Sequence, residues 1–138
     1  MAKLTHINPD KLAPYLPYGL SHAVAAEGGK TVYLSGQVGW DVNGDIAGPD
    51  LASQLAQAHA NIKIILDDIG ATPANIVRLN TYVANYKGLE DGEVVNAANL
   101  KLFAGMKPPS ATLLGFQSLY APEFLCEVEA TVVLDDAG

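Results

Sequence analysis

The chain has 138 residues, a length that suits one domain with one hydrophobic core. Fifteen acidic residues against eight scattered basic ones give a formal net charge of −7, which disfavours binding to the phosphate backbone of a nucleic acid. No stretch approaches the roughly 20 consecutive apolar residues of a membrane helix. The first residues carry no apolar run behind their lysine, so we expect a cytoplasmic protein with no membrane partner.

The N-terminal third predicts an arm followed by two hairpins. Residues 1–20 contain three prolines and little periodicity, which indicates an extended, partly docked arm of the single 1–138 domain. A Gly28-Gly29 pair lies between two β-type runs, 22–26 and 31–36, and predicts an antiparallel hairpin. Residues 37–48 predict a second hairpin with its turn at Asn43-Gly44.

The rest of the chain alternates helices and strands. Asp50 is a good N-cap for a helix whose apolar residues recur at steps of three and four until Gly70 ends it. Alternation over 76–83 predicts a strand with Ile76, Arg78, Asn80 and Tyr82 on one face. A second helix over 88–102 must end before Pro108-Pro109, and strands follow over 111–116 and 124–134.

This order of elements predicts an α+β fold in which a single mixed sheet carries both helices on one face. The other face stays uncovered and is half apolar, because Ile76, Tyr82 and Val133 would point there. A face of this kind usually meets another subunit, so we expect a homo-oligomer.

The sequence contains no P-loop, GxGxxG, GxSxG or HExxH motif and no paired cysteines, and the lone Cys126 lies in an apolar alternation that predicts a buried thiol. His6, His22 and His59 are far apart without a second ligand nearby, so we expect no metal and no cofactor. His59 is expected to be partly exposed on its helix, whereas His22 opens the first strand beside a candidate pocket.

Two further features have alternative interpretations. Glu127 and Glu129 share one strand face about 7 Å apart by strand rise. They are either solvated carboxylates or, if a neighbouring subunit buries them, an acid–base pair. Trp40 and Tyr120 fall in predicted loops, where an aromatic side chain either caps the core or forms a wall of a ligand site.

Several segments taken together, in this order and spacing, resemble the RidA/YjgF family of reactive-imine deaminases between about residues 21 and 134. They are SHAVAA, VYLSGQVGWD, QLAQAHANIKIILDDIGA, RLNTYV, VNAANLKLF, PPSATL and EVEATVV. The resemblance implies a chorismate-mutase-like fold and a homotrimer whose sheets pack around the threefold axis, with pockets in the subunit clefts. It also implies hydrolysis of enamines and imines, such as 2-aminoacrylate, to a 2-keto acid and ammonia without metal or cofactor.

Part of the family's pocket is retained. Ser35 and Gly36 match the segment that lines the pocket, and Asn96 matches the pocket asparagine. Glu127 matches the carboxylate thought to position water. The resemblance therefore implies a catalytic group of Glu127, Ser35 and Asn96, with Gly36 in contact with the substrate.

The rest of the pocket departs from the family. Ser110 stands where the family's arginine grips the substrate carboxylate, and Thr112 falls on the pocket wall. Leu20 replaces a tyrosine and His22 replaces a glutamine. These four residues, together with Trp40, complete the expected substrate-binding set.

The missing arginine matters because a guanidinium makes two charge-assisted hydrogen bonds to a carboxylate, whereas serine offers one neutral donor. At least a roughly hundredfold weaker interaction with 2-imino acids is expected. Arg78 is the only arginine, and Lys107, the nearest base in sequence, is a poor mimic. Two functions stay open: a divergent enzyme acting on an imine, enamine or related C–N compound, and a non-catalytic trimer that binds a small metabolite in the same clefts. Endoribonuclease activity fits poorly with the net charge.

Overall fold

The computed structural model describes residues 2–136. Its strands are Lys3–Ile7 (β1), Ala23–Glu27 (β2), Lys30–Tyr33 (β3), Gln37–Val38 (β4), Ile76–Ala84 (β5), Ser110–Phe116 (β6) and Cys126–Leu134 (β7). Its α-helices are Leu51–Asp68 (α1) and Leu89–Leu102 (α2), and short 3-10 helices span Leu16–Tyr18 and Pro73–Asn75.

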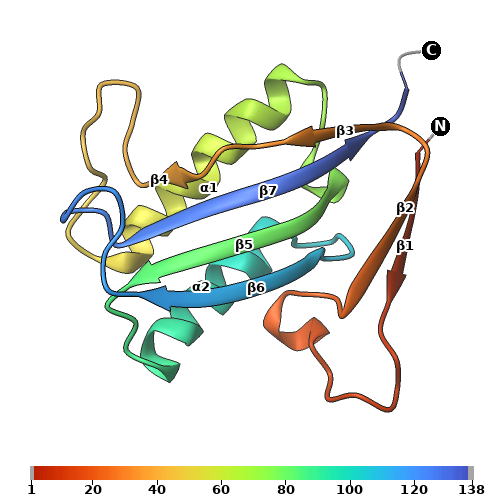
Figure 1. The fold of residues 1–138 in the computed structure, drawn as a ribbon, viewed down its shortest axis with the longest axis horizontal. Coiled ribbons are helices and arrows are strands. Elements are labelled where there is room, and N and C mark those ends of the chain that lie inside the picture. The colour runs from red at the N-terminus through yellow and green to blue at the C-terminus, as the bar shows by residue number, and fades with distance from the viewer. Residues whose placement is uncertain (1, 137–138) are drawn as a thin grey trace.

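One mixed sheet forms the centre of the molecule. Its strand order is β3-β7-β5-β6, with β4 also paired to β7 and with β5 and β6 parallel. Both helices lie behind this sheet in Figure 1, so one face is covered and the other is open. The predicted α+β class, with two helices on one face of a mixed sheet, is confirmed.

The core lies between the helices and the sheet. Leu55, Ile62 and Leu66 of α1 are at most 1% exposed and belong to one cluster with Leu79 of β5 and Val128 of β7. The N-cap also forms as expected, because the side chain of Asp50 accepts a hydrogen bond from the backbone N–H of Ser53. Cys126 is fully buried, as predicted.

The first predicted hairpin is wrong. Gly28 and Gly29 do have positive φ angles of 68° and 77°, but β2 pairs with β1 and β3 pairs with β7. A Cβ atom on Gly29 would lie 2.3 Å from the carbonyl oxygen of Leu134, so the chain passes too close to β7 for any side chain there. The N-terminal segment that was expected to be an arm instead supplies β1, the partner of β2. The second predicted turn, at Asn43-Gly44, does form, and a bridge pairs Trp40 with Ile46 on either side of it.

Three residues expected at the surface are buried. A β-bulge between Ile76 and Arg78 turns Ile76 into the core, where it is 0% exposed. Val133 is 4% exposed because the Gly28-Gly29 corner packs against it. His59 is 6% exposed in a hollow between α1 and α2, and its Nε2 atom has no hydrogen-bond partner. The sequence pattern could not show any of these contacts.

No helix within residues 2–136 combines the length and the apolar character needed to cross a bilayer.

Burial of His59 predicts a pH-dependent stability. Burial, followed by the charge of Lys63, lowers the pKa of His59 from 6.5 to about 4. As the pH falls from 6.5 towards 4, the unfolded chain binds a proton at this position before the folded chain does, so stability is lost in this window. At pH 4.5 we expect the wild type to have lost roughly 2 to 3 kcal/mol more than a His59→Leu variant, relative to pH 7.

Urea unfolding at both pH values and one protein concentration measures this difference. Parallel pH profiles for the two proteins would contradict the buried position of His59.

Candidate functional site

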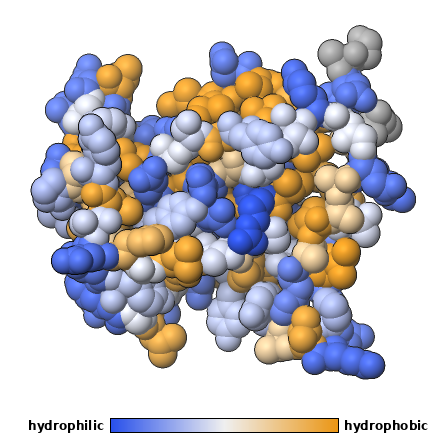
Figure 2. All heavy atoms as spheres, in the orientation of Figure 1, coloured by the Kyte–Doolittle hydropathy of each residue, from blue (hydrophilic) through white to orange (hydrophobic). Residues whose placement is uncertain are grey.

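A cluster of polar side chains occupies the open face of the sheet. Because side chains alternate along a strand, the residues between the buried ones all point to this face. They are Arg78, Asn80 and Tyr82 of β5, Ser110 and Thr112 of β6, and Glu127, Glu129 and Thr131 of β7. Figure 2 shows hydrophilic side chains across the middle of this face with hydrophobic groups beside them.

Glu129 is held at the centre of the cluster by β5. The hydroxyl of Tyr82 and the side-chain amide of Asn80 both donate hydrogen bonds to Oε1 of Glu129, the second at 3.2 Å. The hydrogen bond to Glu129 is the main cause that raises the pKa of Tyr82 above 10. Glu129 is therefore a fixed part of the sheet surface.

Glu127 lies in a different environment. It pairs with Val38 of β4, and this pairing brings the preceding Ser35-Gly36 segment against its side chain. A Cβ atom on Gly36 would lie 1.9 Å from Oε2 of Glu127, so only glycine leaves room for the carboxylate in this position. Glu127 is half-buried and forms no hydrogen bond or ion pair with any residue between 2 and 136. The structure thus places Gly36 directly against the Glu127 carboxylate, with Ser35 preceding Gly36 in the chain, and the catalytic role of these residues stays a prediction.

Ser110 begins β6 at the other end of the cluster. Its hydroxyl donates to the carbonyl of Val77 at 2.9 Å, and its register partner on β5 is Arg78. The guanidinium of Arg78 donates to the hydroxyl oxygen of Thr112. Ser21 bridges to Ser110 and, through its own N–H, binds the carbonyl of Pro109.

This anchor places Leu20 and His22 beside Ser110. Leu20 is half-buried, and the ring of His22 stacks on Tyr15 with centroids 4.0 Å apart. Nε2 of His22 also bonds the carbonyl of Ala13 at 2.8 Å. His22 therefore stabilises the loop between β1 and β2.

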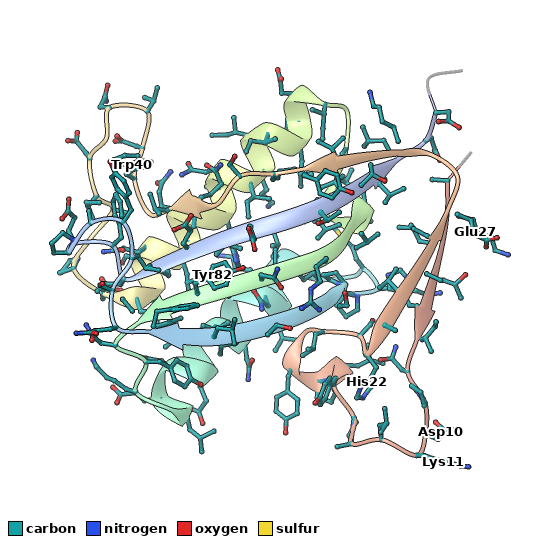
Figure 3. The ribbon with its side chains drawn as sticks, viewed as in Figure 1. Asp10, Lys11, His22, Glu27, Trp40 and Tyr82 are labelled. Atoms are coloured by element: carbon teal, nitrogen blue, oxygen red, sulfur yellow. The ribbon has the colours of Figure 1, made fainter. Side chains whose placement is uncertain are left out.

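The remaining expected residues lie elsewhere. Trp40 packs edge-on against Phe124, with centroids 5.1 Å apart, and Figure 3 shows it at the end of the sheet opposite to His22. Asn96 belongs to α2, behind the sheet that carries Glu127 on its open face. Trp40 therefore caps Phe124, and its second role as a ligand wall stays a prediction.

The expected site is split into two parts within one chain. Ser110 is level with Arg78 on β5, whereas Glu127 is level with Tyr82. Four residues of strand separate these levels, which corresponds to roughly 13 Å. One small molecule cannot contact both Ser110 and Glu127 of the same chain.

Sequence reasoning missed Arg78, Asn80 and Tyr82 as members of the site. Their alternation had placed them on one face, but only the strand pairing shows that they stand beside Ser110 and Glu129. No group of three His, Cys, Asp or Glu side chains that could hold a metal ion occurs among the residues the structure describes.

A mixed sheet with two helices on one face and a polar cluster on the other defines the chorismate-mutase-like α+β class. The family model described as Endoribonuclease L-PSP matches residues 9–134. The solved structure of YyfB from Yersinia pestis, a protein of the conserved Rid family, is 40% identical, with a TM-score of 0.92 over 95% of this chain and 98% of that one. The 2-iminobutanoate/2-iminopropanoate deaminase of Dermatophagoides farinae is 29% identical over 95% of this chain and 94% of its own length. The chain belongs to the RidA/YjgF family.

The hydrogen bond between Tyr82 and Glu129 predicts a shifted titration. Difference absorbance between the wild type and Tyr82→Phe isolates this tyrosine, and we expect its midpoint to lie above 10. Glu129→Gln removes the negative charge and should move the midpoint downward. An unchanged midpoint in Glu129→Gln, with circular dichroism confirming the fold, would mean that the two side chains do not interact.

Proposed function

We propose that this protein hydrolyses an imine, enamine or related C–N metabolite in clefts between the subunits of a homotrimer in the cytoplasm. The single observation that carries the proposal is the half-buried carboxylate of Glu127, packed on Gly36 without a partner among residues 2–136. The printed activity of the Dermatophagoides farinae relative, 2-iminobutanoate/2-iminopropanoate deamination, supports the same reaction class.

The reaction needs one water and no redox partner. Glu127 accepts a proton from water while the water oxygen adds to the imine carbon, and the imine nitrogen gains a proton. The resulting carbinolamine then breaks its C–N bond, releasing ammonia and a carbonyl product. The hydroxyl of Ser35 and the amide of Gly36 would bind the developing polar group. Asn96 takes no part in this step, because α2 lies behind the sheet that carries Glu127 (Figure 1).

The subunit cleft follows from the split site. Because Ser110 and Glu127 are roughly 13 Å apart along the sheet, a second copy must supply the missing half. Tyr33, Leu114 and Phe116 on the open face are 80%, 46% and 45% exposed, and a neighbouring sheet would cover them. Exposed side chains of this kind support the proposed homotrimer.

The alternative is a non-catalytic trimer that binds a small metabolite in the same clefts. The hydroxyl of Ser110 favours it, because its single proton is already donated to the carbonyl of Val77. Serine at this position therefore offers no donor to a substrate carboxylate in this arrangement.

An assay of ammonia release distinguishes the proposed hydrolase from the non-catalytic binding protein. With an imine generated in the assay, we expect wild type to speed ammonia release, and Glu127→Gln to lower kcat at least about a hundredfold, since it removes the general base. Gly36→Ala should also lower kcat while stability changes little, because the added Cβ displaces only the flexible end of Glu127.

Glu27→Gln, an exposed carboxylate of β2 far from the cluster in Figure 3, is the matched control. If wild type does not speed release of ammonia, but still binds the keto product, the binding function is correct instead.

The trimer is tested by mass. Light scattering during gel filtration should give a mass three times the 14.5 kDa of the chain. Leu114→Glu, on the open face, should shift this mass towards the monomer because it buries a charge in the interface. Leu89→Glu, an 82% exposed position at the start of α2, should leave it unchanged. A wild-type monomer at assay concentration would refute the proposed cleft.

A further inference from the structure

The surroundings of Arg78 form a hollow that the proposed chemistry at Glu127 does not use. Arg78 is half-buried on the open face of β5 and lines a hollow of about 250 Å³. The walls of this hollow also include Tyr33, Asn80, Glu129 and Thr131. Two of its polar groups have no ion-pair or hydrogen-bond partner of the matching kind among residues 2–136.

The first is the guanidinium of Arg78. It donates to Thr112, which is a neutral acceptor, and no acidic side chain within residues 2–136 forms an ion pair with it. A guanidinium carries five N–H donors, so most of them remain available. A half-buried cation that forms no ion pair has lost hydration, and the Glu129 carboxylate in the same hollow compensates this loss only from a distance. An anion bound to the guanidinium would compensate it directly.

The second is Oδ1 of Asn80, a buried acceptor without a donor. The amide nitrogen of the same side chain is engaged with Glu129, which fixes its orientation. This oxygen has almost no accessible surface, so it does not contact a ligand in the hollow. The guanidinium of Arg78 alone therefore favours a ligand that carries a carboxylate.

The walls also define the charge of the anion. The planar guanidinium fork matches a carboxylate through two parallel hydrogen bonds. Glu129 stands in the same hollow, so a phosphate dianion would face stronger repulsion than a singly charged carboxylate. Tyr82 and Asn80 of β5 donate hydrogen bonds to Glu129, and these bonds hold its carboxylate in a position where it forms no ion pair with the guanidinium of Arg78.

We propose that Arg78 is the residue that binds the substrate carboxylate, so that the substrates are 2-imino acids. This inference rests on the proposed function. Arg78 is the direct register partner of Ser110, and Thr112 accepts a hydrogen bond from the guanidinium at the next position of β6 on this face. The cation thus stands one strand away from Ser110.

The geometry requires Arg78 and Glu127 to act from different subunits. Within one chain they are four strand residues apart, roughly 13 Å, whereas the imine carbon of a 2-imino acid is bonded directly to its carboxylate. One subunit therefore supplies Arg78 and its neighbour supplies Glu127 at each shared site.

Two substrates that differ only by a carboxylate test the role of Arg78. An amino acid oxidase makes 2-iminobutanoate from 2-aminobutanoate, and an amine oxidase makes the uncharged propan-1-imine from propylamine. We expect Arg78→Gln to lower kcat/KM for 2-iminobutanoate at least about tenfold, and Arg78→Lys to lower it less. Activity on propan-1-imine should stay unchanged in both variants.

The outcomes separate the inference from the proposed function. Lys11→Gln, which removes an equal charge from the exposed tip labelled in Figure 3, should change neither activity. Equal losses on both imines, or a lost trimer in Arg78→Lys as well as Arg78→Gln, would make Arg78 structural and overturn the inference. Hydrolysis of neither imine by wild type would instead refute the proposed function.

Product binding gives a readout that needs no catalysis. We expect calorimetry with 2-ketobutanoate to show binding that weakens at least about tenfold in Arg78→Gln. Addition of Ser110→Arg to that variant should restore part of the affinity, because position 110 is the register partner of Arg78. Equal affinity in wild type and Arg78→Gln would overturn the assignment of the carboxylate to Arg78.

Mixed oligomers test the sharing of the site. Arg78→Gln and Glu127→Gln are each expected to retain at most about a tenth of the wild-type kcat/KM on 2-iminobutanoate as pure proteins. After co-refolding in equal amounts, about a quarter of the interfaces in a cyclic oligomer combine an intact Arg78 with an intact Glu127, so about a quarter of the activity should return. No return of activity would show that the two residues do not act across a subunit boundary.

Discussion

The pairing of β5 with β6 on one side and β7 on the other is the constraint on which the open face depends. The register places Ser110 beside Arg78, Glu129 beside Asn80, and Glu127 beside Tyr82. A slip of one residue in either pairing would turn these side chains into the helix layer and bring apolar ones out. The buried alternation of Leu79, Thr81 and Val83 under the helices fixes the register, because the hydrophobic face cannot be exposed without a large loss of stability.

This register separates the positive and negative groups of the open face. Arg78 stands near one end without a carboxylate partner among the described residues, and Glu127 stands near the other end without a hydrogen-bond donor. Each half-buried charge has lost part of its hydration and forms no ion pair with a residue between 2 and 136. A cleft formed between two copies, with an anionic ligand and a water in it, would satisfy both groups, which is why the proposed chemistry and the proposed assembly depend on each other.

Two glycines allow close approaches to β7, and one of them lies at the site. Gly36 allows the Glu127 carboxylate to lie directly on the chain, whereas Gly29 allows the β2–β3 corner to pass against the end of β7. A side chain at Gly29 would collide with the backbone of Leu134, whereas one at Gly36 would displace the side chain of Glu127. At the other end, Ser21 donates hydrogen bonds to the carbonyls of Pro108 and Pro109, and so the N-terminal segment is fixed next to the start of β6.

The sequence by itself determined what depends on local periodicity and capping. The Asp50 cap, the apolar stripe of α1 and the stop before Pro108 all reflect interactions within a few residues, and the structure has them as predicted. The alternation of β5 and β7 also forms, except at Ile76 and Val133, which are buried. The resemblance of its segments to the RidA/YjgF family also led to the correct family and fold.

Only the tertiary structure decided which strands pair and which polar groups meet. The Gly28-Gly29 turn could be predicted from the sequence, but the partners of β2 and β3 come from residues 3–7 and 126–134. The bulge at Ile76 likewise depends on the pairing with β7. In the same way, Arg78 and Ser110 are 32 positions apart in the chain and become neighbours only through a parallel pairing across α2. Such contacts depend on the whole packed sheet, because one strand pairing is favoured over another by the burial of side chains on all the strands of the sheet.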